Sequence, residues 1–304
     1  MKNKTFLGYL AILGSVFIWS ATFIWTKEIF DANAYTPITI IVVRLIVSIV
    51  FMFLWSWIFR QDEKIEKKDW FWLVLLAFLE PFLYFIGELF GLVRVSSTVT
   101  SVIIATIPLF TPFALSFFFK EKIGLANIIG IAVSLVGVYL LLIKETLEIK
   151  IDLLGVGFLF FAVLSAVGYS VVIYRIIHKY KPLTIVKWQN TFGLLFFLPW
   201  FLFSDLGVIA KSGFQWAYFD NLVYLGLLGS MMAFLLYIYS VKYITIWLAN
   251  AFSNLIPVMT AILSFFILGE KLLPINIVGI GVAIAGLFVS QYKTKQVIPV
   301  AENY

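Results

Sequence analysis

The chain has 304 residues, of which 62% are hydrophobic and 12% are charged, and its formal net charge is +6. Soluble domains carry about a quarter charged residues, so this composition, with a mean hydropathy of +1.04, excludes an ordinary soluble domain. The chain contains no cysteine, which excludes disulfides and thiolate metal sites.

The hydrophobic residues come in runs of roughly 20, the length that an α-helix needs to cross a hydrocarbon core. Runs such as Ile128–Ile143 do not alternate apolar and polar residues, as strands of a membrane barrel would. The sequence therefore predicts an all-α membrane protein with ten transmembrane helices. In chain order they are Phe6–Thr26, Pro37–Phe59, Trp70–Phe90, Val95–Phe119, Leu125–Ile143, Leu153–Tyr174, Thr184–Phe203, Leu222–Tyr239, Ile244–Leu268 and Ile275–Gln291.

The first hydrophobic run follows a short basic stretch, Met1–Lys4. We interpret this run as a membrane span and not as a cleaved signal peptide, because it is long enough to span and has a counterpart later in the chain. In the ten-helix scheme, most of the 22 Lys and Arg residues fall on the side of the N-terminus. The positive-inside rule then predicts a multi-pass inner-membrane protein with both termini in the cytoplasm, including the polar tail 292–304.

The two halves of the chain resemble each other. Leu73 aligns with Leu222, and the offset of 149 residues then holds without a gap. It pairs a proline, a Glu-Lys dipeptide and two glycines in each half. Because each half contains five predicted spans, the second copy enters the membrane from the opposite side, as in the inverted repeats of many secondary transporters. The predicted units are residues 6–143 and 153–291. The repeated positions are Pro108 and Pro257, Glu121-Lys122 and Glu270-Lys271, Gly130 and Gly279, and Gly137 and Gly286.

The pattern P-x12-E-x8-G-x6-G occurs once in each half. With the stretch WSATFIWTK at residues 19–27 and Arg44 in the second span, it resembles the drug/metabolite transporter superfamily, EamA type, over essentially the whole chain. The resemblance implies a ten-helix transporter with a central cavity between two inverted halves. Many members export amino acids, other metabolites or drugs, and some are importers or exchangers. The chain departs from the pattern at Lys120, where glycine is common before the motif glutamate.

Two carboxylates, Glu80 and Glu88, interrupt the third predicted span. Their counterparts in the second half are Gly229 and Tyr237, so the shared fold does not require them. A charge inside a membrane costs roughly 3 kcal/mol or more and marks a candidate functional group. We expect Glu80, which lies near mid-membrane beside a kink at Pro81, to carry a coupling proton, to form a structural ion pair or to contact solute. Glu88 is a second proton-coupling candidate, expected nearer the outer mouth as a solvated residue near Lys27.

Arg44 lies within the second span, roughly 10 Å below the outer surface and between the levels of the two glutamates. It is expected either to pair with one of them or to bind an anionic group of a solute. The matching positions of the second half are Gln189 and Asn190, whose neutral amides suit the wall of a hydrogen-bonding cavity.

Further polar and aromatic candidates for solute binding are Asn250, Asn254 and Trp19. The two asparagines are four residues apart in the ninth predicted span, so a continuous helix would present them on one face. We expect this face to line the cavity, because an amide facing lipid is costly. Trp19 is expected to stack on a ligand or to pack as an ordinary core aromatic.

The predicted function is secondary transport of a small organic metabolite, such as an amino acid or an amphipathic compound, by alternating access. Efflux follows from the resemblance alone, and proton coupling from Glu80. An uncoupled facilitator or exchanger, an intramembrane enzyme and a lipid-handling subunit are the alternatives. The Gly-rich ATP-binding loop is missing, and the single histidine, His178, lies in a basic loop, so no cofactor or metal is expected. The predicted partners are the solute and membrane lipid, with no nucleic acid and a possible homodimer. The glycines of the fifth and tenth helices are expected to allow close packing on the bundle or on a second subunit.

Overall fold

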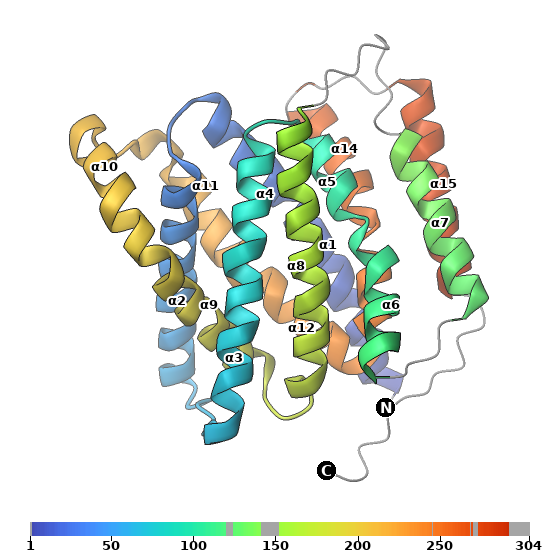
Figure 1. Cartoon of the computed structure of the whole chain (residues 1–304), viewed down its shortest axis with the longest axis horizontal. Coiled ribbons are helices and arrows are strands. Elements are labelled where there is room, and N and C mark those ends of the chain that lie inside the picture. The colour runs from blue at the N-terminus through green and yellow to red at the C-terminus, as the bar shows by residue number, and fades with distance from the viewer. Residues whose placement is uncertain are drawn as a thin grey trace.

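A computed structural model describes residues 2–119, 124–140, 152–244, 246–267, 269 and 273–291. These residues form helices and no strand (Figure 1). The α-helices are α1 (Lys2–Asp31), α2 (Pro37–Ile58), α3 (Trp70–Ala77), α4 (Tyr84–Leu92), α5 (Ser97–Ile104), α6 (Ile107–Phe119), α7 (Leu125–Leu140), α8 (Leu153–Ile176), α9 (Pro182–Trp200), α10 (Leu206–Ser212), α11 (Phe219–Tyr224), α12 (Phe234–Ile244), α13 (Ile246–Phe252), α14 (Leu255–Ile267) and α15 (Pro274–Gln291). Short segments of tighter or wider helix are η1 (Lys67–Asp69), η2 (Phe78–Leu83), η3 (Phe201–Asp205), η4 (Trp216–Tyr218) and η5 (Leu225–Ala233).

The described residues contain seven helical stretches that are long and apolar enough to cross a membrane. They coincide with the predicted first, second, third, sixth, seventh, eighth and ninth spans. The predicted fourth, fifth and tenth spans correspond to shorter apolar helices, Ile107–Phe119, Ile128–Gly137 and Pro274–Gly286. The all-helical prediction is confirmed for the described residues, and the count of ten spans stays a prediction.

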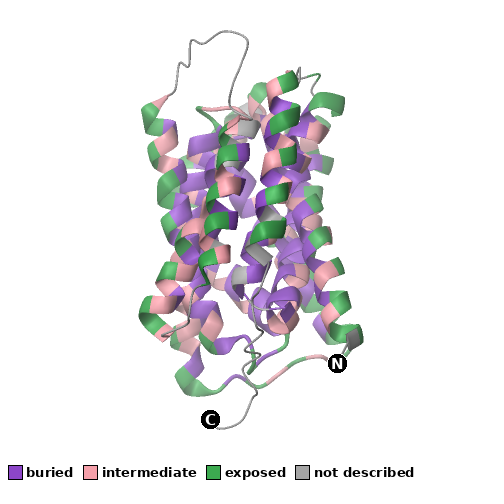
Figure 2. Cartoon of the chain, turned by 90° about the vertical axis from the view of Figure 1, so that its right-hand side faces the viewer, coloured by how far each residue is buried: buried purple, intermediate pink, exposed green. Residues whose placement is uncertain are grey.

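The interior of the bundle is buried, and its outer surface carries large hydrophobic side chains (Figure 2). Phe203 is 92% exposed and Phe117 is 82% exposed. A soluble protein rarely exposes so much apolar surface, whereas lipid tails solvate it well. The exterior of the fold therefore suits a hydrocarbon environment.

The predicted fourth and ninth spans are both interrupted, and at matching points of the repeat. The first break separates α5 from α6, and the second separates α13 from α14. A proline follows each break, Pro108 in the first copy and Pro257 in the second. Proline lacks a backbone N–H and clashes with the preceding turn, which explains why the helix is interrupted there.

The predicted third span is broken at Glu80, whose φ of −143° and ψ of 117° are those of extended backbone. Pro81 follows within η2, so the kink that the sequence predicted at this proline is confirmed. The hydroxyl of Ser165 on α8 donates a 2.6 Å hydrogen bond to the Leu79 carbonyl next to the break. The irregular backbone is thus satisfied by a neighbouring helix, as hydrocarbon surroundings require.

Helices α7 and α15 pack tightly against each other (Figure 1). Gly137 lies against Gly279 and Ala283, and Gly286 lies against Gly130 and Ser134. Residue numbers rise along one helix as they fall along the other, so the helices are antiparallel. The same repeat positions meet twice with the copies exchanged, as a two-fold axis between the halves would require.

Some sequence predictions fall outside the described residues. These concern the repeated dipeptides Glu121-Lys122 and Glu270-Lys271, the departure at Lys120 and the tail 292–304.

Candidate functional site

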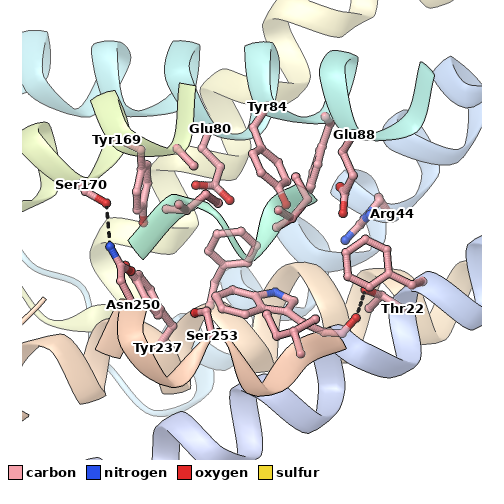
Figure 3. A pocket seen from close by; sticks show the side chains of 18 residues that line it. Thr22, Arg44, Glu80, Tyr84, Glu88, Tyr169, Ser170, Tyr237, Asn250 and Ser253 are labelled. Atoms are coloured by element: carbon pink, nitrogen blue, oxygen red, sulfur yellow. Dashed lines mark hydrogen bonds between the residues drawn. The ribbon is translucent and has the colours of Figure 1, made fainter. Parts of the chain in front are cut away.

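A central pocket lies where helices from both halves meet (Figure 3). Its empty volume is about 680 Å³, including the part open to solvent. The wall includes residues next to both helix breaks, Ile104 and Ile107 in the first copy and Ser253 and Ile256 in the second. The aromatic and polar part of the wall comes from Trp19, Thr22, Phe23, Arg44, Glu80, Tyr84, Phe85, Glu88, Tyr169, Ser170, Phe234, Tyr237 and Asn250.

Glu80 and Glu88 both face this pocket, with Tyr84 between them (Figure 3). Their exposed fractions are only 8% and 7%. The expectation that Glu88 is a solvated residue near Lys27 is therefore wrong. Helix packing encloses it, and Lys27 pairs instead with Asp31 at 3.2 Å. Within the described part of the chain, neither Glu80 nor Glu88 has a basic nitrogen within 4 Å.

Arg44 reaches the pocket from α2 and is 3% exposed. Its Nε donates a 2.8 Å hydrogen bond to the Ser230 hydroxyl, and its guanidinium carbon lies 4.3 Å from the Phe85 ring centroid. Gly229 leaves room for it, because a Cβ on Gly229 would lie 3.1 Å from Arg44 Nη2. No carboxylate of the described residues comes within ion-pair distance of this guanidinium. Among the residues that the structure describes, the remaining N–H donors of Arg44 are thus not paired with a carboxylate.

Asn250 lies in the pocket wall, but its amide already bonds to three neighbours. The Tyr237 hydroxyl donates to Asn250 Oδ1 at 2.6 Å. Its Nδ2 donates to the hydroxyls of Thr111 and Ser170, both at 3.2 Å. Asn250 therefore connects α6, α8, α12 and α13 at the base of the pocket.

Asn254 does not line the pocket. The prediction that it shares a face with Asn250 assumed a continuous helix, but α13 ends at Phe252 and Asn254 lies in the break. Its Nδ2 donates instead to Ser134 on α7 at 2.8 Å.

Gln189 and Asn190 lie behind the pocket wall. Asn190 Nδ2 donates to the Ser48 hydroxyl and to the Ser230 carbonyl, both at 2.8 Å. Gln189 accepts a 3.2 Å hydrogen bond from Tyr169, which itself faces the pocket. Direct contact of these two amides with a solute stays a prediction.

Trp19 lines the pocket from α1 as part of an aromatic cluster. Its ring is edge-on to Phe234 with 5.3 Å between centroids, and it is tilted against Tyr237 at 5.4 Å. Trp19 therefore packs as a core aromatic and also borders the cavity. Stacking of Trp19 on a ligand stays a prediction.

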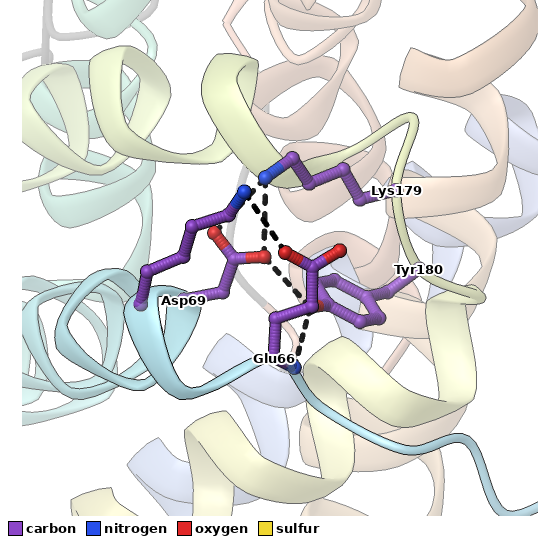
Figure 4. Close-up of polar contacts among 5 residues, drawn as sticks. Glu66, Asp69, Lys179 and Tyr180 are labelled. Carbon is purple, nitrogen blue, oxygen red and sulfur yellow. Dashed lines mark hydrogen bonds and ion pairs between the residues drawn. The ribbon is translucent and has the colours of Figure 1, made fainter. Parts of the chain in front are cut away.

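The two halves are joined by polar contacts at one end of the bundle, which we name the α8–α9 latch (Figure 4). The Tyr180 hydroxyl donates to Asp69 at 2.7 Å, and Lys179 pairs with Asp69 at 3.1 Å. The Glu66 backbone N–H donates to the Tyr180 hydroxyl, and the Thr184 hydroxyl donates to Glu63 at 2.6 Å. The exposed His178 next to it is not among these contacts.

Equivalent contacts, the α1–α2 latch, join the halves around the start of α2. The Tyr35 hydroxyl donates to the Gln215 carbonyl at 2.9 Å. The hydroxyls of Thr36 and Thr39 both donate to Asp205. Each latch thus uses a tyrosine and a threonine of one half to hold the other half.

The sequence carries a signal for these latches, although none of the predicted site residues belongs to them. The two donor segments read YTPIT at residues 35–39 and YKPLT at residues 180–184. In each, proline begins a helix, and the tyrosine and threonine flank it at the same spacing. Aligning the two copies around Pro37 and Pro182 reveals the pattern.

Comparison with known proteins places the chain among transporters. The EamA-like transporter family matches residues 6–143 and again residues 153–292. The chain belongs to this family. As a member with several apolar helices, it is an integral, multi-pass membrane protein whose family implies a small-molecule solute.

Several relatives resemble it over most of their length. "Uncharacterized transporter YetK" of Bacillus subtilis is 28% identical over 85% of this chain and 80% of its own. An "Uncharacterized transporter" of Archaeoglobus fulgidus is 26% identical over 97% and 100%. "WAT1-related protein At3g02690, chloroplastic" of Arabidopsis thaliana is 24% identical over 95% and 70%. The first two names describe transporters, a class of protein that is generally not enzymatic.

A solved crystal structure has the same fold. It is 14% identical in sequence, covers 95% of this chain and 98% of its own, and superposes with a TM-score of 0.72.

Proposed function

We propose that this protein is a secondary transporter that moves a small organic metabolite, an amino acid or a related amphipathic compound, by alternating access. The central pocket is the solute site. The observation that carries this proposal is a pocket between the two halves, beside two broken helices, whose buried charged groups have no ion-pair partner among the described residues. Transporters commonly bind solutes at discontinuous helices near the membrane midplane.

The proposed membrane arrangement is two inverted sets of five spans in the inner membrane, with both termini in the cytoplasm. The exchanged glycine contacts of α7 and α15 support the inversion. The α8–α9 latch is then on the cytoplasmic side and the α1–α2 latch on the outer side. Because each latch joins the two halves, alternating access requires the two latches to open in turn.

Three residues have distinct roles in the proposed mechanism. Arg44 binds an anionic group of the solute, since its guanidinium is buried in the pocket and no carboxylate of the described part of the chain pairs with it. Trp19 contacts the apolar part of the solute. Glu80 takes up or releases a proton when the solute arrives or leaves. The family resemblance favours efflux.

An uncoupled facilitator or exchanger is the second candidate, because the same pocket serves a carrier without a proton step. Glu88 shares the pocket with Glu80 and is a second candidate for the coupling proton, so Glu80 alone does not distinguish a coupled carrier from an uncoupled one.

Counterflow in proteoliposomes tests the proposal. Vesicles preloaded with one unlabelled amino acid or amphipathic metabolite at a time should accumulate the labelled compound transiently. A panel in which no compound gives counterflow would overturn the transport proposal. A pH gradient should then drive transport by the wild type and by the control Asp31→Asn, but not by Glu80→Gln. If Glu80→Gln responds to the gradient like the wild type, Glu80 does not carry the coupling proton. If the gradient drives neither the wild type nor the control, the protein is the uncoupled carrier.

A further inference from the structure

One end of the buried Gln189 amide lacks a hydrogen-bond partner in the part of the chain that the structure describes. The residue is fully buried, and its Oε1 accepts the hydrogen bond from Tyr169. Its Nε2 makes no hydrogen bond among the described residues. Leaving a buried amide donor unsatisfied is costly, so such a group is expected to have a partner in another state of the protein.

Residues one helical turn from the Tyr169–Gln189 pair contact the chain on either side of Glu80. Gly193, one turn further along α9, is covered by Pro81, whose Cγ would lie 2.3 Å from a Cβ there. Ser165, one turn before Tyr169 on α8, bonds to the Leu79 carbonyl. Leu79 therefore contacts α8, and Pro81 contacts α9. The Tyr169–Gln189 pair lies one helical turn from these contacts.

The repeat leads to the same position independently. Gln189 is the counterpart of Arg44, and Gly229 is the counterpart of Glu80. Arg44 lies directly against Gly229. Because contacts between the copies recur with the copies exchanged, as α7 and α15 show, the contact of Arg44 with Gly229 predicts a contact of Gln189 with Glu80.

We propose that Gln189 is a positioning residue for Glu80, and that the free end of its amide hydrogen-bonds the Glu80 carboxyl group during the transport cycle. This inference rests on the proposed proton-coupling role of Glu80. Gln189 would then act through Glu80 and not on the solute, unlike its expected role from sequence alone.

The chemistry of an amide suits this task. A guanidinium at position 189, as in the other half, would hold Glu80 in its charged form through an ion pair. An uncharged amide can donate to the carboxylate and, after rotation, accept from the carboxyl group. Gln189 can therefore stay bonded to Glu80 in both protonation states.

Other titratable groups also face Glu80 and set the background for any pH effect. They share the pocket wall, from α2, α4, α8 and α12. They are Arg44, Tyr84, Glu88, Tyr169 and Tyr237.

Infrared difference spectroscopy of the reconstituted protein tests this without a known solute. The carbonyl band of protonated Glu80 is the band that titrates with pH in the wild type and is missing in Glu80→Gln. In Gln189→Leu this band should move to higher frequency, because its hydrogen bond is lost. The pH at which half of it has disappeared should rise by about one unit.

Tyr169→Phe serves as a second variant, because it leaves Gln189 in place but removes the hydroxyl that orients it. It should shift the band in the same direction by a smaller amount. Thr191→Val is the matched control on α9, since the Thr191 hydroxyl bonds only to its own helix at Lys187. It should leave the band unchanged.

Three results would overturn the inference. In the first, the band is the same in Gln189→Leu as in the wild type. In the second, Thr191→Val shifts it equally. In the third, no titrating band depends on Glu80. A failure of the counterflow experiment would overturn the transport proposal but would leave a Gln189-dependent band intact, so the two failures are distinguishable.

Discussion

Gly137 of α7 and Ala283 of α15 are so close that a Cβ on Gly137 would lie 2.2 Å from the Ala283 backbone nitrogen. The same distance recurs between Gly286 and the Ser134 backbone nitrogen, which are the matching positions of the repeat. Backbone atoms cannot move away as a flexible side chain can. The motif glycines are therefore required for the contact between the fifth helix of each half.

Gly286→Ala should destabilise the protein by about 1–3 kcal/mol, as overpacking of a close contact does. The matched control is Gly281→Ala on the same helix, because nothing lies within 4 Å of a Cβ there. Thermal unfolding in detergent should give a lower midpoint for Gly286→Ala and an unchanged one for the control. Equal midpoints would show that α7 and α15 are not packed as described.

Opening of each latch should be required for transport. The chain has no cysteine, so pairs introduced at Glu63 and Thr184, or at Thr39 and Asp205, can form only the intended disulfide. Oxidation of either pair should stop counterflow, because each latch must open once per cycle, and a reductant should restore it. Single-cysteine variants are the controls. Full transport by an oxidised pair would mean that the corresponding latch stays closed during transport.

Lys187 of α9 is buried, with its ammonium 3.0 Å from the Ser56 hydroxyl and paired with Asp62. Removing one member of a buried pair costs roughly 3–5 kcal/mol, but the Asp62 side chain is 66% exposed, so about 1 kcal/mol is expected for Asp62→Asn. Lys187→Met should cost less, because it removes the buried charge and keeps an apolar stem. Denaturation of both variants and of the double variant checks this order. The prediction fails if Asp62→Asn is the milder change.

The start of α8 should lose protection in acid. Hydrogen bonds from the Gly155 backbone N–H and from Arg94 hold the pKa of Asp152 below its ordinary value of 3.8. A pKa that is lower in the folded state stabilises the fold above the unfolded pKa, and the stabilisation is lost as pH falls through the folded value. Amide exchange at Leu154 and Gly155, which both donate to Asp152, should therefore accelerate below about pH 4 relative to its intrinsic rate. Asp152→Asn should show no such pH dependence.

The site shows where local reasoning from sequence stops. Arg44, Glu80 and Glu88 were found because a charge in a hydrophobic run is visible in the sequence. Which of these charges pair is not visible, since pairing depends on distances between helices. The structure brings them into one pocket without an ion pair among them.

Asn254 shows the same limit within one helix. The prediction that Asn254 shares a face with Asn250 holds for a continuous helix, but the helix is interrupted before Pro257. The sequence shows this proline, but whether a proline bends, breaks or only loosens a helix depends on which neighbours satisfy the freed carbonyls.

The sequence by itself determined the helical class, the repeat and the family resemblance, because run length, periodicity and repeated residues can be read from the order of residues along the chain. The tertiary structure alone decided which polar groups share the pocket, which amides are already used, and how the copies contact each other. These depend on packing between segments that lie far apart in the chain, and no local pattern records the distances between them.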